Sequence, residues 1–337
     1  MHIPDGYLGP QTYAVIDVAI LPVWAAAASR VRRTLKSRQV PLMALGAAFS
    51  FVLMMFNVPV FGGTTAHAVG AVLIAVLLGP WAACLSVSTA IVIQALAFGD
   101  GGITAIGANC LNMAVVMPFV GFAIYRLVSG PAPSLRRKIA ASGLGAYLGL
   151  VAASISAGIE FGLQPLLAHD AAGHALYAPY SLAVAVPSMA VTHLVVGLLE
   201  AAVTMGVVAA LARSDPALVA MRPASRPLTW LWAGLGALIL LTPVGLLASG
   251  SAWGEWAPAA VKGMVGYMPA GLQRMSGAWT AAMPDYAPAF IKDPVVGYVA
   301  AALTGAALIA AIVWLVGIAL SRRDDASPVP TDDEEPS

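Results

Sequence analysis

Apolar runs long enough to cross a lipid bilayer recur along the whole length of this 337-residue chain. A membrane-spanning helix needs about 20 consecutive, mostly apolar residues, and fewer where the helix ends inside protein. Nine runs fit this description, at about residues 11–29, 40–58, 66–79, 81–98, 104–127, 139–163, 181–212, 228–249 and 294–320. Only 10% of the residues are charged, whereas soluble domains carry about 25%. The pattern predicts an all-α polytopic membrane protein and excludes soluble, collagen-like and disulfide-rich secreted chains.

Basic residues gather in four short clusters between or after these runs. The clusters hold 14 of the 17 Lys and Arg side chains and lie at residues 30–38, 126–138, 213–226 and 322–323. Cytoplasmic loops carry the excess of Lys and Arg in membrane proteins. Four, two and two predicted helices separate successive clusters, so all four clusters can lie on the cytoplasmic side. This predicts an outside N-terminus, a cytoplasmic C-terminus and no signal peptide, because no basic region precedes the first run.

The spacing of the runs divides the chain into two units. Residues 1–212 form a predicted seven-helix bundle, and residues 213–227 form a cytoplasmic linker rich in Arg and Pro. Residues 228–320 form a two-helix unit whose loop, residues 250–293, lies outside the membrane. Residues 321–337, with the acidic stretch from Asp324 to Ser337, are expected to be a disordered cytoplasmic tail. The net charge of +1 gives no reason to expect a nucleic acid partner.

The amino terminus carries an unusual set of nitrogen atoms. His2 follows Met1 directly, and a large second residue leaves the initiator methionine in place with a free amino group. The Met1 amine, the backbone nitrogen of His2 and its imidazole Nδ1 can form fused chelate rings in one plane. Such planar nitrogen sets suit Ni²⁺ and Cu²⁺. The alternative is a histidine near an exposed terminus with no ligand role, and a turn at residues 4–6 is predicted to fold the terminus back onto the helices.

A second histidine lies beside a glycine pair between two apolar runs. His67 is predicted to open the third helix on the outer side, where an ionisable residue at membrane depth suggests a function. Imidazole is the commonest nitrogen ligand of metal ions in proteins. Thr64 and Thr65 are expected either to cap this helix through their hydroxyl groups or to support the histidine from behind.

Two amides interrupt the run at residues 104–127. Asn109 and Asn112 need hydrogen-bond partners in an apolar helix. They either join helices to one another or orient metal ligands, and the sequence leaves both interpretations open. Cys84 and Cys110 lie in apolar runs and are interpreted as small buried side chains rather than a disulfide or a zinc site.

A further polar pair lies on the seventh predicted helix. His193 and Glu200 are seven residues apart and therefore share one helix face. They belong either to an internal polar path or to a hydrogen bond between helices. His169 and His174 flank a loop and are interpreted as solvated, with transient metal capture as the alternative. The loop at residues 99–102 lacks a following lysine and is not a phosphate-binding loop, and we find no nucleotide-binding signature.

Four of these motifs together resemble a known transporter family. They are MHIPDGYL at residues 1–8, GGTTAHAVG at 62–70, GANCLNMA at 107–114 and the set Pro187, His193, Gly197 and Glu200. They resemble the cobalt/nickel substrate-capture (S) components of energy-coupling-factor ABC transporters, the CbiM/NikM family. The resemblance implies that the Met1 amine, the His2 amide nitrogen and imidazole, and His67 are the four metal ligands. It also implies the inner membrane of a prokaryote.

The resemblance extends to two further features. S components share a small-residue motif in a core helix that faces the coupling subunit, and Ala44 and Ala48 match it. Small residues four apart allow two helices to approach closely. Residues 228–320 are similar in layout to the small two-helix N subunit of these systems, although the Pro-Asp-Gly-Leu-Glu string of one N-type branch is absent.

The expected function is uptake of Co²⁺ or Ni²⁺ as transported substrate, with no cofactor and no enzymatic activity in this chain. The resemblance implies a transmembrane coupling (T) subunit and two cytoplasmic ABC ATPases as partners within the lipid bilayer. Two alternatives are an S component for an organic vitamin, which would need an aromatic-lined pocket, and a membrane-embedded enzyme built on His193 and Glu200. The sequence does not choose between cobalt and nickel, nor explain the exclusion of Cu²⁺, which binds such nitrogen sets more tightly.

Overall fold

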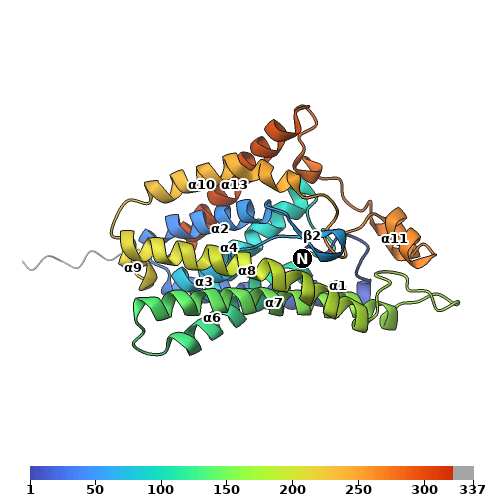
Figure 1. The fold of residues 1–337 in the computed structure, drawn as a ribbon, viewed down its shortest axis with the longest axis horizontal. Coiled ribbons are helices and arrows are strands. Elements are labelled where there is room, and N and C mark those ends of the chain that lie inside the picture. Colours follow the sequence, from blue (N-terminus) through green and yellow to red (C-terminus); the bar gives the residue numbers. More distant parts are fainter. Residues whose placement is uncertain (322–337) are drawn as a thin grey trace, which may run out of the picture.

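The computed structural model describes residues 1–321 and confirms an all-α polytopic membrane protein (Figure 1). Eight helical segments within this range are long and apolar enough to cross a membrane. They are α1 (Pro10–Thr34), η1 (Ser37–Gln39) with α2 (Val40–Met54), α4 (Pro80–Ile93) with η3 (Gln94–Phe98), α5 (Ile106–Cys110) with η4 (Leu111–Val116) and α6 (Met117–Ser129), α7 (Leu135–Leu167), α8 (Leu182–Ser214), α10 (Thr229–Leu241) with η5 (Thr242–Leu247), and α13 (Pro294–Leu320). The predicted tail lies almost wholly outside the described residues.

The third predicted span is wrong as a single membrane-length helix. Residues 66–79 contain only α3 (Ala71–Leu78), whose eight residues extend about 12 Å, far less than the bilayer core. A hairpin of β1 (Val58–Val60), η2 (Phe61–Gly63) and β2 (Thr64–Ala66) precedes it. The helix is buried against α4, α6 and α7. Hydropathy cannot distinguish a helix buried in protein from one that faces lipid, because both surroundings are apolar.

The local structure around His67 also differs from the prediction. Thr64 and Thr65 belong to β2, and the residue that caps α3 is Gly70, with φ of 76°. His67 therefore lies in an extended stretch rather than at a helix start. The helix ends near the basic residues, since Leu78 lines a cavity together with Lys36 and Arg222. β2, an irregular stretch and α3 thus reach from His2 to the basic end of the bundle, where a single helix was expected.

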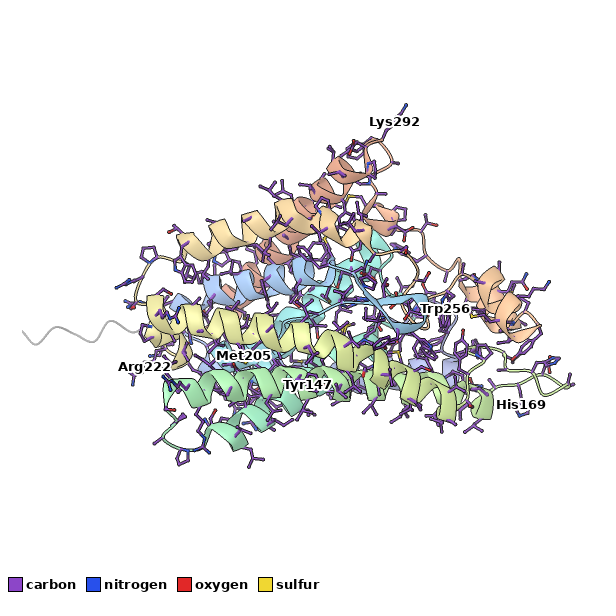
Figure 2. The ribbon with its side chains drawn as sticks, in the orientation of Figure 1. Tyr147, His169, Met205, Arg222, Trp256 and Lys292 are labelled. Atoms are coloured by element: carbon purple, nitrogen blue, oxygen red, sulfur yellow. The ribbon has the colours of Figure 1, made fainter. Side chains whose placement is uncertain are left out.

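The described basic clusters meet at one end of the bundle. Lys36 and Arg222, from the first and third clusters, line one cavity, and Lys138 from the second lies with residues of α9 (Pro216–Val219) in another. The Ser37 hydroxyl lies 3.2 Å from that of Ser321 at the end of α13. In Figure 2 Arg222 lies at this end, whereas His169 and Trp256 lie toward the opposite end. The even helix spacing deduced from the sequence fits this arrangement.

The carboxy-terminal helices pack on the first unit. α13 lies along α2, and its Gly305 approaches the ring of Phe51 so closely that a Cβ atom would clash with it. Ala44 and Ala48 of α2 are buried, with 2% and 0% of their surfaces exposed. The loop at residues 250–293 contains α11 (Pro258–Val265), α12 (Ala270–Met275) and η6 (Pro284–Tyr286), and in Figure 1 α11 lies at the end of the molecule opposite α9.

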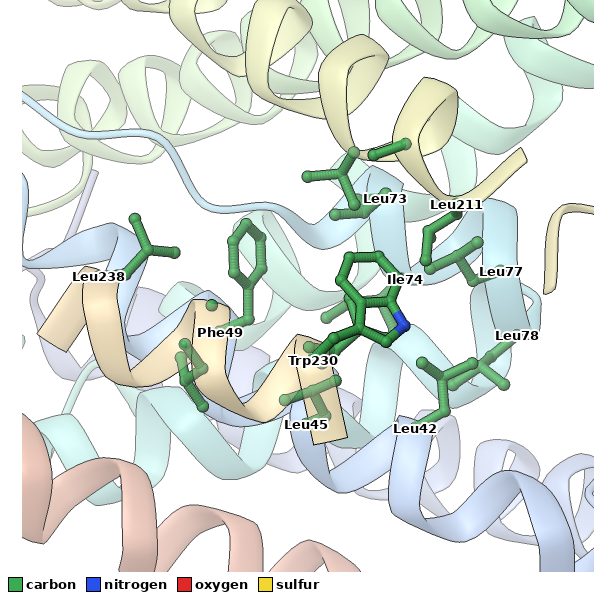
Figure 3. Close-up of a pocket in the computed structure, with 16 residues that line it drawn as sticks. Leu42, Leu45, Phe49, Leu73, Ile74, Leu77, Leu78, Leu211, Trp230 and Leu238 are labelled. Carbon is green, nitrogen blue, oxygen red and sulfur yellow. The ribbon is translucent and has the colours of Figure 1, made fainter. Parts of the chain in front are cut away.

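A cavity of about 220 Å³ lies between α2, α3, α8 and α10 (Figure 3). Leu and Ile side chains dominate its lining, and Phe49 and Trp230 are its aromatic residues. None of the lining residues is charged. The cavity therefore offers apolar surface rather than the hydrogen-bonding groups that orient a vitamin.

Candidate metal site

The amino-terminal segment inserts into the protein instead of extending into solvent. Figure 1 places the N-terminus inside the fold, beside β2. Met1, His2 and Ile3 expose 2%, 1% and 0% of their surfaces. Buried backbone groups need partners, so the rest of the chain must supply hydrogen bonds to this segment.

Asn109 of α5 supplies two of these bonds. Its Oδ1 accepts from the Ile3 backbone nitrogen at 2.7 Å, and its Nδ2 donates to the Ile3 carbonyl at 3.2 Å. That carbonyl also accepts from the Gly102 nitrogen at 2.8 Å. The Asp5 carboxylate then accepts from the Thr104 nitrogen and hydroxyl at 2.9 and 2.6 Å. Asn109 thus holds the backbone of the segment that carries the candidate nitrogen atoms.

Asn112, three residues later, has a different partner. Its Nδ2 donates to the Glu160 carboxylate of α7 at 2.8 Å, so it joins η4 to α7. The two amides of one sequence motif therefore bind different parts of the protein, because α5 directs Asn109 to the amino-terminal segment and η4 directs Asn112 to α7.

The segment brings the two histidines together. His2 Nδ1 lies 3.2 Å from His67 Nε2, with both rings buried. His67 Nδ1 lies 3.2 Å from the Ala68 carbonyl. A carbonyl oxygen only accepts, so Nδ1 carries the proton of the neutral ring and His67 Nε2 keeps its lone pair toward His2.

Glu200 holds the backbone behind His67. Its carboxylate accepts from the Val69 nitrogen at 2.7 Å and from the Gly70 nitrogen at 2.9 and 3.1 Å. His193, predicted to share a face with it, instead contacts the Met189 carbonyl of its own helix at 2.8 Å. Glu200 therefore supports the site through the backbone, and His193 contacts its own helix.

Two carboxylates also reach the amino terminus, and the sequence analysis missed both. The Met1 amino group lies 3.4 Å from Glu255 Oε1, and His2 Nδ1 lies 3.1 Å from Asp100 Oδ1. Glu255 comes from the loop of the carboxy-terminal unit, which also pairs with β2 through the Thr65 nitrogen and the Ser251 carbonyl at 3.3 Å. The sequence did carry a signal for both, because each is an isolated acidic residue in a predicted loop, Asp100 among glycines and Glu255 beside Trp256.

Burial sets the protonation of the site. It lowers the pKa of His2 to about 3, helped by the nearby Met1 amino group and opposed by the nearby side chain of Gln94. Burial, the amino group and His2 together hold the pKa of His67 well below its usual value. Burial raises the pKa of Glu255 to about 7, although the amino group opposes the rise. Both rings are therefore neutral at physiological pH, with lone pairs available.

The arrangement can provide four nitrogen donors close together. They are the Met1 amine, the His2 backbone nitrogen, His2 Nδ1 and His67 Nε2. Among residues 1–321 no group of three or more His, Cys, Asp or Glu side chains is placed to hold a metal ion, so backbone nitrogens would have to complete the set. His169 and His174 lie elsewhere, in an exposed loop where His174 stacks on Tyr267 and pairs with Asp170 at 3.3 Å.

Comparison with known families identifies the chain. The family model CbiM, described as the cobalt uptake substrate-specific transmembrane region, matches residues 2–218. The chain belongs to the CbiM family. A second model, the PDGLE domain, matches residues 228–322. The N-like interpretation of this unit is thus confirmed, and the PDGLE branch applies even though the Pro-Asp-Gly-Leu-Glu string itself is absent.

Individual relatives of this CbiM-family chain are transporters. A fused nickel transport protein, NikMN, of Rhodobacter capsulatus is 53% identical over 96% of this chain and 99% of its own length. A probable fused nickel transport protein, LarMN, of Lactiplantibacillus plantarum is 48% identical over 77% of this chain and 78% of its own. A crystal structure of a truncated transition metal transporter, 53% identical, aligns with a TM-score of 0.59 over 64% of this chain and 99% of that one. The chain is therefore a transport protein, and the enzyme alternative is wrong.

Proposed function

We propose that this chain captures a divalent transition metal ion, Ni²⁺ or Co²⁺, as the substrate-binding subunit of an energy-coupling-factor transporter. The Met1 amine, the His2 backbone nitrogen, His2 Nδ1 and His67 Nε2 are the proposed ligands. The carboxylates of Asp100 and Glu255 place negative charge beside the cation. An organic vitamin fits less well as the substrate, because relatives are named for nickel and cobalt and the apolar cavity is lined by α2, α3, α8 and α10 and not by the amino-terminal segment.

The buried amino terminus, with His2 Nδ1 and His67 Nε2 at 3.2 Å, is the observation that carries the proposal. Two nitrogen ligands at right angles, each about 2.0–2.1 Å from a metal ion, are about 2.9 Å apart. The present separation needs only a small adjustment to reach that value. A charged amine and a free strand end are otherwise costly to bury, so a ligand role explains why this terminus is inside the protein.

The substrate is proposed to be Ni²⁺ rather than Co²⁺. Three relatives are named as fused nickel transport proteins, two of them as probable or putative ones, whereas relatives named for cobalt match a smaller part of the chain, such as 38% for the CbiM protein of Moorella thermoacetica. Square-planar nitrogen coordination also favours Ni²⁺ over Co²⁺.

The remaining machinery is proposed from the resemblance and from the charge pattern. The basic end faces the cytoplasm, where two ABC ATPases and a transmembrane coupling subunit supply the free energy for release. Ala44 and Ala48 are the proposed contact with that subunit. Because both alanines are buried here, such contact requires neighbouring helices to separate along α2. The loop that carries Glu255 covers the metal site from the outside and moves aside for loading.

The experiment that tests the site compares two forms of the full chain, both tagged at the C-terminus. One has its native N-terminus, and the other has a single glycine before Met1, which converts the amine to an amide. We expect the native form to bind one equivalent of Ni²⁺ and the extended form to lose at least a hundredfold in affinity. His67→Ala is expected to weaken binding without moving the terminus. Equal binding by the native and extended forms would refute the amine as a ligand.

A further inference from the structure

A cavity of about 240 Å³ at the basic end of the bundle, here called the cationic cavity, is lined by two basic side chains and, among the described residues, by no acidic one. The two are Lys36, just before α2, and Arg222, in the linker after α9. Both residues are exposed, and neither forms an ion pair with a carboxylate of residues 1–321. The cavity therefore brings two positive charges together with no negative charge to balance them, which suits an anion.

The apolar cavity between α2, α3, α8 and α10 begins where the cationic cavity ends. Leu78, the last residue of α3, lines both cavities. In Figure 3 the Trp230 ring lies between Leu78 and Phe49. The apolar cavity thus leads from the cationic cavity along the helices into the depth of the membrane.

The apolar cavity has about the length of one leaflet of a bilayer. On α10 its lining runs from Trp230 to Leu238, which is about 12 Å at a rise of 1.5 Å per residue. On α2 it runs from Leu42 to Phe49, or about 10 Å. The hydrocarbon core of a bilayer is about 30 Å thick, so one leaflet supplies about 15 Å of it. A single acyl chain that enters at the basic end can lie in this cavity over most of its length.

We propose that the two cavities form one binding site for an anionic phospholipid. Its phosphate lies between Lys36 and Arg222, and one of its acyl chains fills the apolar cavity. Basic pockets between membrane helices on the cytoplasmic side bind anionic head groups, and the proposed topology places this end of the bundle there. A free phosphate would use only the cationic cavity, and a lipid without net charge would gain little from it. An anionic phospholipid matches both.

The bound lipid joins the two units of the chain. α2 and α3 belong to the CbiM-type unit, whereas Trp230 lies in the first turn of α10 in the PDGLE-type unit, and Arg222 lies in the linker between them. Trp230 is exposed, and within residues 1–321 its indole N–H has no hydrogen-bond acceptor. Tryptophan is enriched at the level of the head groups, where its ring meets hydrocarbon and its N–H meets polar groups. The lipid thus fills the space between α8 and α10 and holds the linker to the start of α2.

The experiment measures lipid binding to the full chain by native mass spectrometry. The chain is stripped of lipid in detergent and titrated separately with phosphatidylglycerol and with phosphatidylcholine that has the same acyl chains. Each basic residue near an anionic lipid contributes about a factor of five in affinity. We therefore expect one phosphatidylglycerol to bind about 5- to 30-fold more tightly than phosphatidylcholine. Glycerol phosphate, which has the charge but no acyl chain, should not displace it at the same concentration.

One pair of variants tests the head-group end of the site. Lys36→Gln combined with Arg222→Gln should lower the affinity for phosphatidylglycerol to that for phosphatidylcholine. The matched control is Arg126→Gln combined with Arg136→Gln, which removes the same charge from another basic cluster. These two arginines line neither cavity, so the control should keep the native preference.

A second pair of variants tests the acyl-chain end. Gly234 of α10 lines the apolar cavity, whereas Gly236 does not. A Cβ atom at either position meets no atom within 4 Å, so both positions accept a larger side chain, and both helices gain the same intrinsic propensity. Gly234→Leu should fill the apolar cavity and weaken the binding of phosphatidylglycerol at least fivefold. Gly236→Leu should leave the affinity unchanged.

Three results would overturn the proposal. The first is equal affinity of the native chain for the two phospholipids, and the second is unchanged phosphatidylglycerol binding in either the Lys36 and Arg222 variant or in Gly234→Leu. The third is displacement of the lipid by an equal concentration of glycerol phosphate, which would indicate an anion site without a lipid. Because the site shares no residue with the proposed metal ligands, these results do not depend on the proposed function.

Discussion

Replacing Asn109 by leucine tests how the buried amino-terminal segment is held. Leucine has a similar size but cannot accept from the Ile3 nitrogen, which loses its 2.7 Å bond. The Ile3 carbonyl keeps its bond from Gly102, so one buried donor is left without a partner. Such a group costs about 1–3 kcal/mol. Because the cation requires the segment in place, we expect Ni²⁺ affinity to fall by about 5- to 150-fold, since each 1.4 kcal/mol corresponds to a factor of about ten.

The assay is competition for Ni²⁺ between the purified chain and a chromogenic chelator. Asn112→Leu is the matched control, because it removes the bond between η4 and α7 and leaves Ile3 untouched. That variant should unfold at a lower temperature and bind Ni²⁺ within about twofold of the native chain. If Asn109→Leu binds as tightly as the native chain, the segment does not have to be anchored for the metal to bind, and our reasoning about the site fails.

Three further predictions address the site and its surroundings. Gly102→Ala places a Cβ atom against the backbone nitrogen of Asp5 and should weaken Ni²⁺ binding at least tenfold, whereas Gly206→Ala, with open space around it, should change nothing. Because the pKa of His2 is about 3 and that of His67 is also depressed, their protonation does not limit binding between pH 5.5 and 7.5. Glu255, whose pKa burial raises to about 7, also loses its proton in this range, so the profile is measured in Glu255→Gln as well. In that variant affinity should still rise by about tenfold per pH unit for each proton that metal binding releases from the backbone nitrogens; a flat profile would point to imidazole ligands alone. Burial tends to raise the pKa of Asp215, but hydrogen bonds from Ser225 and Arg226 outweigh burial and lower the pKa. The ionised Asp215 carboxylate therefore stabilises the fold at neutral pH, and this stabilisation is lost as the carboxylate is protonated in acid. Asp215→Asn should lower the melting temperature at pH 7 more than at pH 3, and an equal loss at both values would exclude this role.

Local sequence pattern predicted most of the helices and part of the site. Eight of the nine expected spans correspond to helices long enough to cross a bilayer, because long apolar runs between charged loops have few alternatives. The ninth prediction failed at residues 66–79, where Gly70 and the carboxylate of Glu200 begin a short helix inside the protein. Asn109 and Asn112 show the limit of motif analysis, since one motif places two amides in different surroundings.

The sequence by itself determined the membrane class, the positions of eight long helices and the grouping of basic residues, because each depends on composition over one continuous stretch. It also singled out His2 and His67, through their resemblance to a known family. Only the tertiary structure placed Asp100 and Glu255 at the amino terminus. These contacts join residues separated by about a hundred to more than two hundred and fifty positions. No local periodicity encodes such pairs, because helix packing and loop paths decide which side chains meet.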